Sequence, residues 1–125
     1  MPTQINHVAI YASNIYRTSE FYQSIFGAKE TERKYTSSGR IRMLRLSLND
    51  KQCIELFNYD DCYAQPSIPH VTSGYMHIGY FVSNVEDYIK KVSLIEQDFI
   101  GSDGIRRVFL RDPENNQIEL IENKI

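Results

Sequence analysis

The chain has 125 residues, which suits one ordinary domain able to bury about two-thirds of the surface that its unfolded form would expose. Its 14 basic and 16 acidic side chains are interspersed and leave a formal net charge of −2, so the sequence offers no basic stripe for a nucleic acid. No apolar run approaches the roughly 18 residues of a membrane-spanning helix, and the first residues lack the pattern of a secretion signal. We therefore expect a cytoplasmic protein with neither a nucleic-acid nor a membrane partner.

The first predicted elements are a strand and a helix. A mostly apolar run follows His7, as is typical of a strand, and it stops at Ser13-Asn14, which suit a helix N-cap. Apolar side chains then recur at helical spacing over residues 15–26. Gly27 suits the position that follows a helix C-terminus, so we expect the helix to end there.

A hairpin and a linker come next. Residues 42–48 alternate at period two, Asn49-Asp50 form a turn pair, and residues 52–59 have the composition of the next strand. Residues 60–73 hold prolines among polar side chains. We expect that segment to be an extended linker.

The second half of the chain repeats the first. Residues 77–85 match residues 7–15 after an interval of 70, and residues 118–121 match residues 54–57 after an interval of 64. Both copies of the first stretch end in Ser-Asn, which again predicts a helix start. The elements predicted for the second copy are a helix over residues 85–95, strands over 106–111 and 117–122, and a turn over 112–116 between these strands.

The order of elements is therefore βαβββ, twice. This order predicts an α+β fold in which two βαβββ modules form a cupped mixed sheet with the helices on its outer face. We assign residues 1–125 to one domain, with the first module over about 4–59, the linker over about 60–73 and the second module over about 74–122.

Four residues in the predicted strands suit a metal site. Side chains alternate along a strand, so each repeat places one His and one Glu opposite its helix-facing apolar residues. These residues are His7, Glu55, His77 and Glu119. One such residue alone is usually structural, but two carboxylates buried beside two imidazoles require a compensating charge, which one divalent cation supplies. This ligand set suits Ni, Co, Zn, Fe or Mn, and the pattern does not choose among them.

Other side chains are expected on the same face. The alternation places Tyr11 and Phe81 beside the two histidines, and Arg45, Arg107 and Phe109 beside the two glutamates. The arginines favour an anionic substrate, yet long side chains of this kind also lie at a rim with solvated heads. The aromatic rings can wall a substrate cavity or pack in an ordinary way. The pattern leaves both alternatives open.

Nearly the whole chain resembles a known family. The motifs that carry the resemblance are His7-Val8-Ala9-Ile10, Asn14-Ile15, Glu20-Phe21-Tyr22, Phe26-Gly27, Ile54-Glu55-Leu56-Phe57, Met76-His77-Ile78, Asp112-Pro113 and Ile118-Glu119-Leu120. They resemble the glyoxalase/bleomycin-resistance/extradiol-dioxygenase superfamily, whose members are called vicinal oxygen chelate proteins. The chain looks most like its short bacterial members that are similar to glyoxalase I, a lactoylglutathione lyase.

This resemblance implies an activity. The set of two histidines and two glutamates is similar to that of glyoxalase I, in which a metal polarises a carbonyl while a carboxylate moves a proton on the adjacent carbon. Resemblance assigns that role to Glu119 or Glu55, with Glu119 preferred, and implies a small carbonyl compound as substrate. Because family members commonly pair modules across subunits, it also implies a homodimer.

The chain departs from glyoxalase I where glutathione is held. Glutathione-using members generally carry Arg four residues after the first ligand and Asn four residues after the second, whereas this chain has Tyr11 and Tyr59. Asn58 lies one position away and is the remaining candidate for a substrate contact there. We therefore expect little use of glutathione.

One scaffold hosts several functions in this superfamily, so alternatives remain. An epimerase of the methylmalonyl-CoA type usually has Gln where this chain has Glu55. An extradiol dioxygenase uses two His and one Glu around iron with further acid–base residues, and this chain has no spare strand histidine. A sequestering protein of the bleomycin-resistance type uses an aromatic, acidic cup without a metal, which the four-ligand set disfavours.

Overall fold

The computed structural model describes residues 4–58 and 75–123, and its contacts divide the chain into two compact units, residues 1–64 and 65–125. Each unit contains one βαβββ module, so the predicted α+β class and the order of elements are confirmed. The predicted linker over 60–73 lies outside the described residues. The expectation that both sheets form one cup with the helices outside concerns the packing of one module on the other and stays a prediction.

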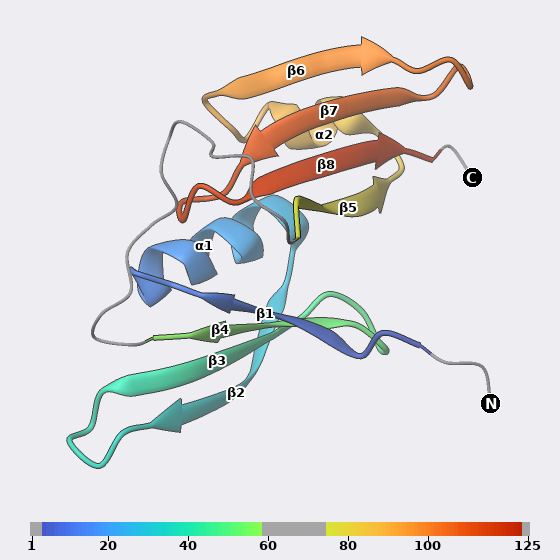
Figure 1. Cartoon of the computed structure of the whole chain (residues 1–125). Coiled ribbons are helices and arrows are strands. Elements are labelled where there is room, and N and C mark those ends of the chain that lie inside the picture. The colour runs from blue at the N-terminus through green and yellow to red at the C-terminus, as the bar shows by residue number, and fades with distance from the viewer. Residues whose placement is uncertain (1–3, 59–74, 124–125) are drawn as a thin grey trace. The chain divides into compact units, whose positions relative to one another are not determined.

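The two modules contain the same series of elements (Figure 1). Module 1 consists of β1 (His7–Tyr11), α1 (Ile15–Phe26), β2 (Lys29–Tyr35), β3 (Ile41–Ser47) and β4 (Cys53–Phe57). Module 2 consists of β5 (His77–Val82), α2 (Val85–Ile89), β6 (Ile95–Ile100), β7 (Arg106–Arg111) and β8 (Gln117–Glu122).

Both sheets have the same strand order. In module 1 the order is β1-β4-β3-β2, and in module 2 it is β5-β8-β7-β6. The first strand of each module pairs in parallel with the last, and the other pairs are antiparallel. The first and last strands of a module are therefore neighbours, although they are far apart in sequence. This pairing brings the predicted His of each module beside the predicted Glu.

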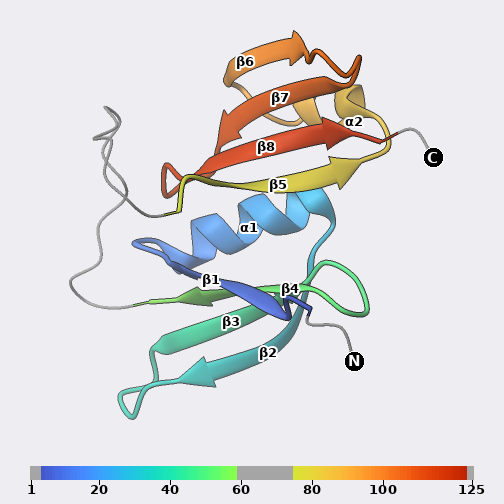
Figure 2. The same ribbon diagram turned by 45° about the vertical axis from the view of Figure 1, so that its right-hand side comes forward.

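Helix α1 begins and ends as its sequence predicts. The Asn14 side chain accepts a hydrogen bond from the backbone N–H of Arg17, which would otherwise lack a partner in the first turn. Gly27 ends the helix in the left-handed conformation, with φ of 68°, and its N–H donates to the carbonyl of Gln23. The helix lies across one face of its own sheet and packs on β3 and β4 (Figure 1 and Figure 2).

Helix α2 is shorter than predicted. The expected helix over 85–95 ends at Ile89, because a turn follows at Lys90 and Lys91 and strand β6 begins at Ile95. Ile95 pairs with Leu110 in the β6–β7 ladder, and this pairing overrides the helical spacing that the sequence suggested. The Lys91 ammonium lies 5.7 Å from the centre of the Tyr88 ring, a cation–π contact that favours the turn.

Each sheet buries the residues that alternate with the candidate ligands. Fully buried side chains in module 1 include Leu44, Leu46, Ile54 and Leu56, and those in module 2 include Val108, Leu110, Ile118 and Leu120. Burial of such a side chain typically contributes about 1.5–3 kcal/mol. The polar face of each sheet is therefore fixed by its apolar face, since a shift of one residue would exchange the two. No helix in the described part of the chain is long and apolar enough to cross a membrane.

Candidate functional site

In module 1, His7 and Glu55 lie diagonally across the β1–β4 pair. Glu55 is directly opposite Ala9, and His7 is opposite Cys53. The Nε2 atom of His7 lies 3.8 Å from Oε1 of Glu55. The Nδ1 atom of His7 is 2.8 Å from Oδ1 of Asn6, so Nδ1 carries the proton and donates it to that amide oxygen. Nε2 is thereby the ring nitrogen that lies toward the carboxylate of Glu55.

Arg45 holds the other oxygen of Glu55. Its Nε and Nη2 atoms donate to Oε2 of Glu55 at 3.1 and 2.8 Å, and its Nη1 atom lies 2.7 Å from Oε2 of Glu32. A register shift in β2 between Glu30 and Glu32 places Glu32 opposite Arg45. Glu55 is only 7% exposed, so the guanidinium supplies the compensating charge that a buried carboxylate needs.

In module 2, His77 and Glu119 lie closer together. The Nε2 atom of His77 is 2.8 Å from Oε2 of Glu119. Gly79 faces Glu119 in the β5–β8 ladder, and a Cβ atom at Gly79 would lie 3.9 Å from the same oxygen. The Nδ1 atom of His77 is buried and has no hydrogen-bond partner among the described residues. The proton therefore belongs on Nε2, which donates it to Glu119.

Arg107 contacts Glu119 from the neighbouring strand. Its Nε atom lies 3.3 Å from Oε1 of Glu119, and its Nη1 and Nη2 atoms donate to Asp103 at 2.9 and 2.8 Å. The Arg107 guanidinium, followed by the backbone N–H of Ile105, lowers the pKa of Asp103 from 3.8 to about 2. Gly101 leaves the space for this ion pair, since a Cβ there would lie 2.6 Å from Nη1 of Arg107.

The two arginines are not at equivalent positions. Arg45 stands directly opposite Glu55, whereas the residue opposite Glu119 is Phe109. Phe109 packs edge-on against His77 with ring centres 5.4 Å apart, and it stacks on Phe99 at 6.1 Å. The carboxylate of module 1 therefore faces a cation, and that of module 2 faces an aromatic wall.

The remaining predicted residues lie nearby or face solvent. Tyr11 and Phe81 are exposed on β1 and β5. Tyr11 lines a hollow of about 190 Å³ together with Ala9, Ile10 and Phe57. The Asn58 amide donates to the carbonyl of Ile41 at 3.3 Å, so it is tied to its own hairpin. Tyr59 lies outside the described residues.

The separations of the donor atoms within each module are close to those that a shared divalent metal would impose. A metal at 2.0–2.2 Å from an imidazole nitrogen and a carboxylate oxygen holds these atoms roughly 2.9–3.5 Å apart. The observed separations of 3.8 Å at His7 and Glu55 and 2.8 Å at His77 and Glu119 lie on either side of that interval. Within residues 4–58 and 75–123, however, no three His, Cys, Asp or Glu side chains gather closely enough to hold a metal ion. Each module thus presents half of the predicted ligand set.

Comparison with known proteins decides the family. The sequence pattern of the glyoxalase/bleomycin resistance protein/dioxygenase superfamily matches residues 4–120. The chain belongs to this superfamily. It is 28% identical over 123 residues to the uncharacterized protein YwkD of Bacillus subtilis strain 168, covering 94% of this chain and 95% of that protein.

Solved structures agree with the family. A glyoxalase family protein from Enterococcus faecalis is 29% identical, with a TM-score of 0.78 and coverage of 95% of this chain and 97% of the other. The lactoylglutathione lyase of Agrobacterium tumefaciens is 22% identical, with a TM-score of 0.68 and coverage of 98% and 96%. The second likeness concerns the fold alone. The superfamily named from the motifs of the sequence is confirmed.

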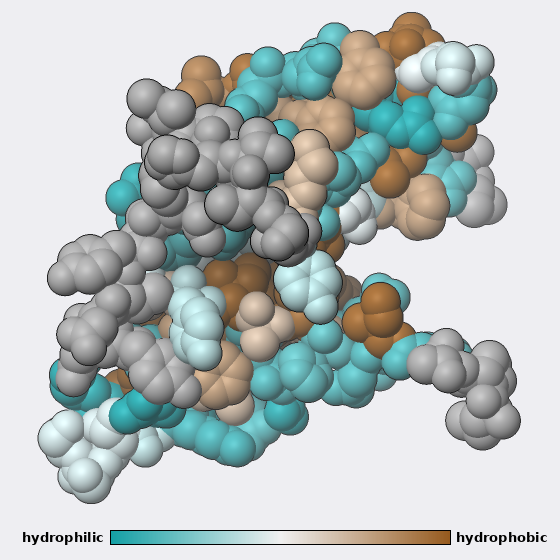
Figure 3. Space-filling view, in the orientation of Figure 1, coloured by the Kyte–Doolittle hydropathy of each residue, from teal (hydrophilic) through white to brown (hydrophobic). Residues whose placement is uncertain are grey.

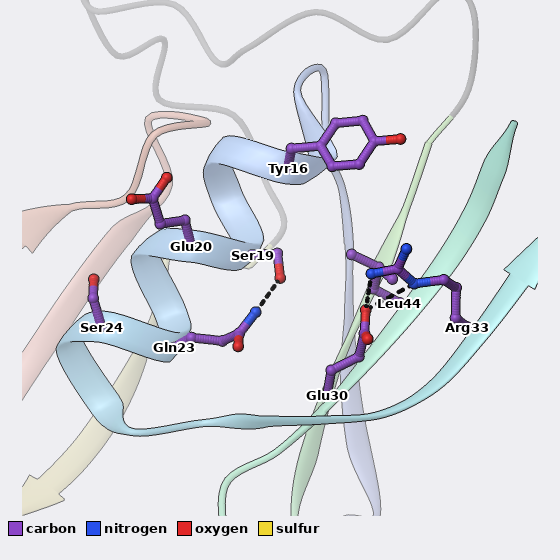
Figure 4. A pocket seen from close by; sticks show the side chains of 8 residues that line it. All are labelled: Tyr16, Ser19, Glu20, Gln23, Ser24, Glu30, Arg33 and Leu44. Carbon is purple, nitrogen blue, oxygen red and sulfur yellow. Dashed lines mark hydrogen bonds and ion pairs between the residues drawn. The ribbon is translucent and has the colours of Figure 1, made fainter.

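This glyoxalase-superfamily chain also has a hollow on the opposite face of the module 1 sheet. It has a volume of about 550 Å³ and lies between α1 and strands β2 and β3 (Figure 4). Four of its polar side chains pair with one another, because Gln23 donates to Ser19 at 2.8 Å and Arg33 donates to Glu30 at 2.7 and 3.0 Å. We assign the hollow no role.

Two residues at the candidate site were not foreseen from the sequence of this superfamily member. Glu32 belongs to the charged run of β2, and Asp103 to the turn before β7. Their contacts with Arg45 and Arg107 depend on a strand irregularity and a turn conformation. The sequence held only a weak signal for these contacts, namely that each acidic residue belongs to an element next to a strand that contains an arginine.

Proposed function

We propose that this protein is a metal-dependent lyase or isomerase of the glyoxalase type, which moves a proton next to the carbonyl of a small metabolite. One observation carries the proposal. Each module sets an imidazole nitrogen and a carboxylate oxygen against each other at a separation close to that across a metal ion. In this proposal, His7, Glu55, His77 and Glu119 hold one divalent metal, either within a chain or across two copies.

The proposed roles follow from the surroundings of each residue. A bound divalent metal would polarise the carbonyl oxygen of the substrate. Glu119 is the better candidate for the general base, because Arg45 donates two hydrogen bonds to Oε2 of Glu55, whereas the contact of Arg107 with Oε1 of Glu119 is longer, at 3.3 Å. Phe109 packs beside His77 and would help to exclude water from the proton transfer.

The substrate in this proposal is a small carbonyl compound bound without glutathione. Tyr11, Phe81 and Phe109 offer aromatic contact surfaces. The Asn58 amide is held by Ile41, which reduces its value as a substitute for the glutathione-binding Asn of related enzymes. Arg45 and Arg107 stay candidates for contact with an anionic substrate, although both guanidinium groups are already bonded to carboxylates.

Metal analysis tests this proposal. Protein purified without added metal, then titrated with Ni²⁺, Co²⁺ and Zn²⁺, should bind one divalent ion per four-ligand site. His77→Ala should weaken that binding by tenfold or more while leaving the circular dichroism spectrum unchanged, since it removes one of four ligands. His70→Ala is the matched control, because the third histidine is outside the proposed set. A parent protein that binds no divalent metal would refute the proposal.

A second candidate function is metal-free ligand sequestration. The observation in its favour is that both glutamates already lie against arginines, so neither carboxylate depends on a metal for its compensating charge. The same titration separates the two functions. Absence of metal binding in both the parent and the His77→Ala protein would favour sequestration.

A further inference from the structure

The two glutamates have the same pattern of basic neighbours, although the distances differ. In each case, one carboxylate oxygen faces a histidine Nε2 and the other contacts an arginine. For Glu55, Oε1 faces His7 and Oε2 is held by Arg45. For Glu119, Oε2 faces His77 and Oε1 lies 3.3 Å from Arg107. The arginines come from non-equivalent positions, so simple repetition of the module does not explain the agreement.

We propose that Arg45 and Arg107 are positioning residues that orient the two glutamates toward the metal. This inference rests on the proposed function, because it assumes that the glutamates ligate a metal. Each arginine contacts the carboxylate oxygen that points away from the histidine, and this contact fixes the rotation of the carboxylate. The oxygen beside the histidine is then presented as a single ligand atom. Hydrogen bonds of this kind to ligating carboxylates commonly change metal affinity 10- to 100-fold.

A second carboxylate holds each arginine in place. Glu32 on β2 binds Nη1 of Arg45 at 2.7 Å, and Asp103 in the β6–β7 turn binds both terminal nitrogens of Arg107. Each arginine therefore bridges an inner glutamate and an outer carboxylate. The outer partner keeps the guanidinium at its position when the inner glutamate also contacts a cation.

The main alternative is that the arginines act only through their charge. A positive charge next to a cation site repels the metal, so in that case removal of the arginine would raise metal affinity. Positioning predicts the opposite direction. The two accounts also differ for lysine, which keeps the charge but cannot reproduce the paired hydrogen bonds of a guanidinium.

Calorimetric titration of the full chain with Co²⁺ tests the inference, together with the visible absorption spectrum of the bound ion. Replacement of either arginine should lower Co²⁺ affinity by about 10- to 100-fold and alter the absorption bands. The variants are Arg45→Lys, Arg45→Gln, Arg107→Lys and Arg107→Gln. Gly101→Ala should also lower the Co²⁺ affinity, although it changes no charge, because its Cβ would displace the Arg107 guanidinium. The matched control is Arg106→Gln, since Arg106 binds Asp98 and Glu86 instead of the candidate ligands.

The outcomes are distinct. Higher affinity in the glutamine variants with no change in the lysine variants would overturn positioning and support a purely electrostatic effect. Parent-like affinity and spectra in all five site variants would overturn any role of the arginines while leaving the metal proposal intact. Failure of the parent itself to bind Co²⁺ would refute the proposed function and this inference together.

Discussion

At the scale of single residues, the ion pair between Arg107 and Asp103 gives a pH-dependent prediction. The guanidinium holds the pKa of Asp103 at about 2 instead of 3.8, so the pair is fully formed above about pH 4 and is lost as the pH falls through 2. Arg107→Gln should return the pKa toward 3.8. Titration of the Asp103 carboxyl carbon by NMR measures this shift directly.

The control for that titration is Asp98, whose pKa is lowered by Arg106. Arg107→Gln should leave the Asp98 titration where it is in the parent protein. If Asp103 kept its low pKa in the variant, the backbone N–H of Ile105 would be its main partner, and the bridge from Asp103 through Arg107 to Glu119 would lose its support.

The faces of the candidate residues could be predicted from the sequence, whereas their partners could not. Alternation places Arg45 on the same face as Glu55, and their direct ion pair agrees with this placement. The contact of Arg45 with Glu32 depends on the register shift in β2. A bulge is a small difference in backbone geometry that leaves little trace in residue composition, so period-two reasoning does not reveal it.

At the scale of elements, the end of α1 gives a stability prediction. Gly27 has φ of 68°, and nothing lies within 4 Å of a Cβ built there. The penalty of Gly27→Ala should therefore come from backbone strain alone, at about 1–2 kcal/mol. Gly27→Asn should be milder, because Asn tolerates the left-handed region better. Urea unfolding measures both, and an alanine variant as stable as the parent would contradict the role of the left-handed cap.

The two helices show where local patterns suffice. The ends of α1 were predicted correctly, because Asn14 and Gly27 act through neighbours within one turn. The predicted end of α2 was wrong, because Ile95 pairs with Leu110 of β7 and belongs to strand β6. Helix starts are set by capping within a few residues, whereas this helix end is set by a tertiary pairing.

At the scale of the whole molecule, the fold could be predicted from the internal repeat of the sequence. Equivalent His-containing and Glu-containing strands appear twice in the sequence, and the structure contains the same strand order twice. The face on which a side chain lies is determined within its own sheet, so the faces could be predicted from the sequence of one module alone. Contacts between the modules determine how the two half-sites combine. The alternation of residues along a strand does not predict such contacts.

The edges of the two sheets lead to a prediction about assembly. The edge strand β2 is protected by charge, since five of its seven residues are Lys, Glu or Arg, and this edge is largely hydrophilic at the bottom of Figure 3. The edge strands β1 and β5 contain no Lys, Arg, Asp or Glu, and each exposes an aromatic side chain, with Tyr11 67% and Phe81 75% exposed. Exposed apolar side chains on unprotected edge strands are typical of surfaces that pair with a partner.

We therefore expect a homodimer in which β1 and β5 contribute to the interface. Phe81→Glu should shift the protein toward monomer, because it places a charge on that surface, whereas Tyr35→Glu on the protected strand β2 should leave the assembly unchanged. Light scattering at micromolar concentration measures both effects. A parent protein that is monomeric under these conditions would rule out a metal site shared between chains, and His7, Glu55, His77 and Glu119 would then have to meet within one chain.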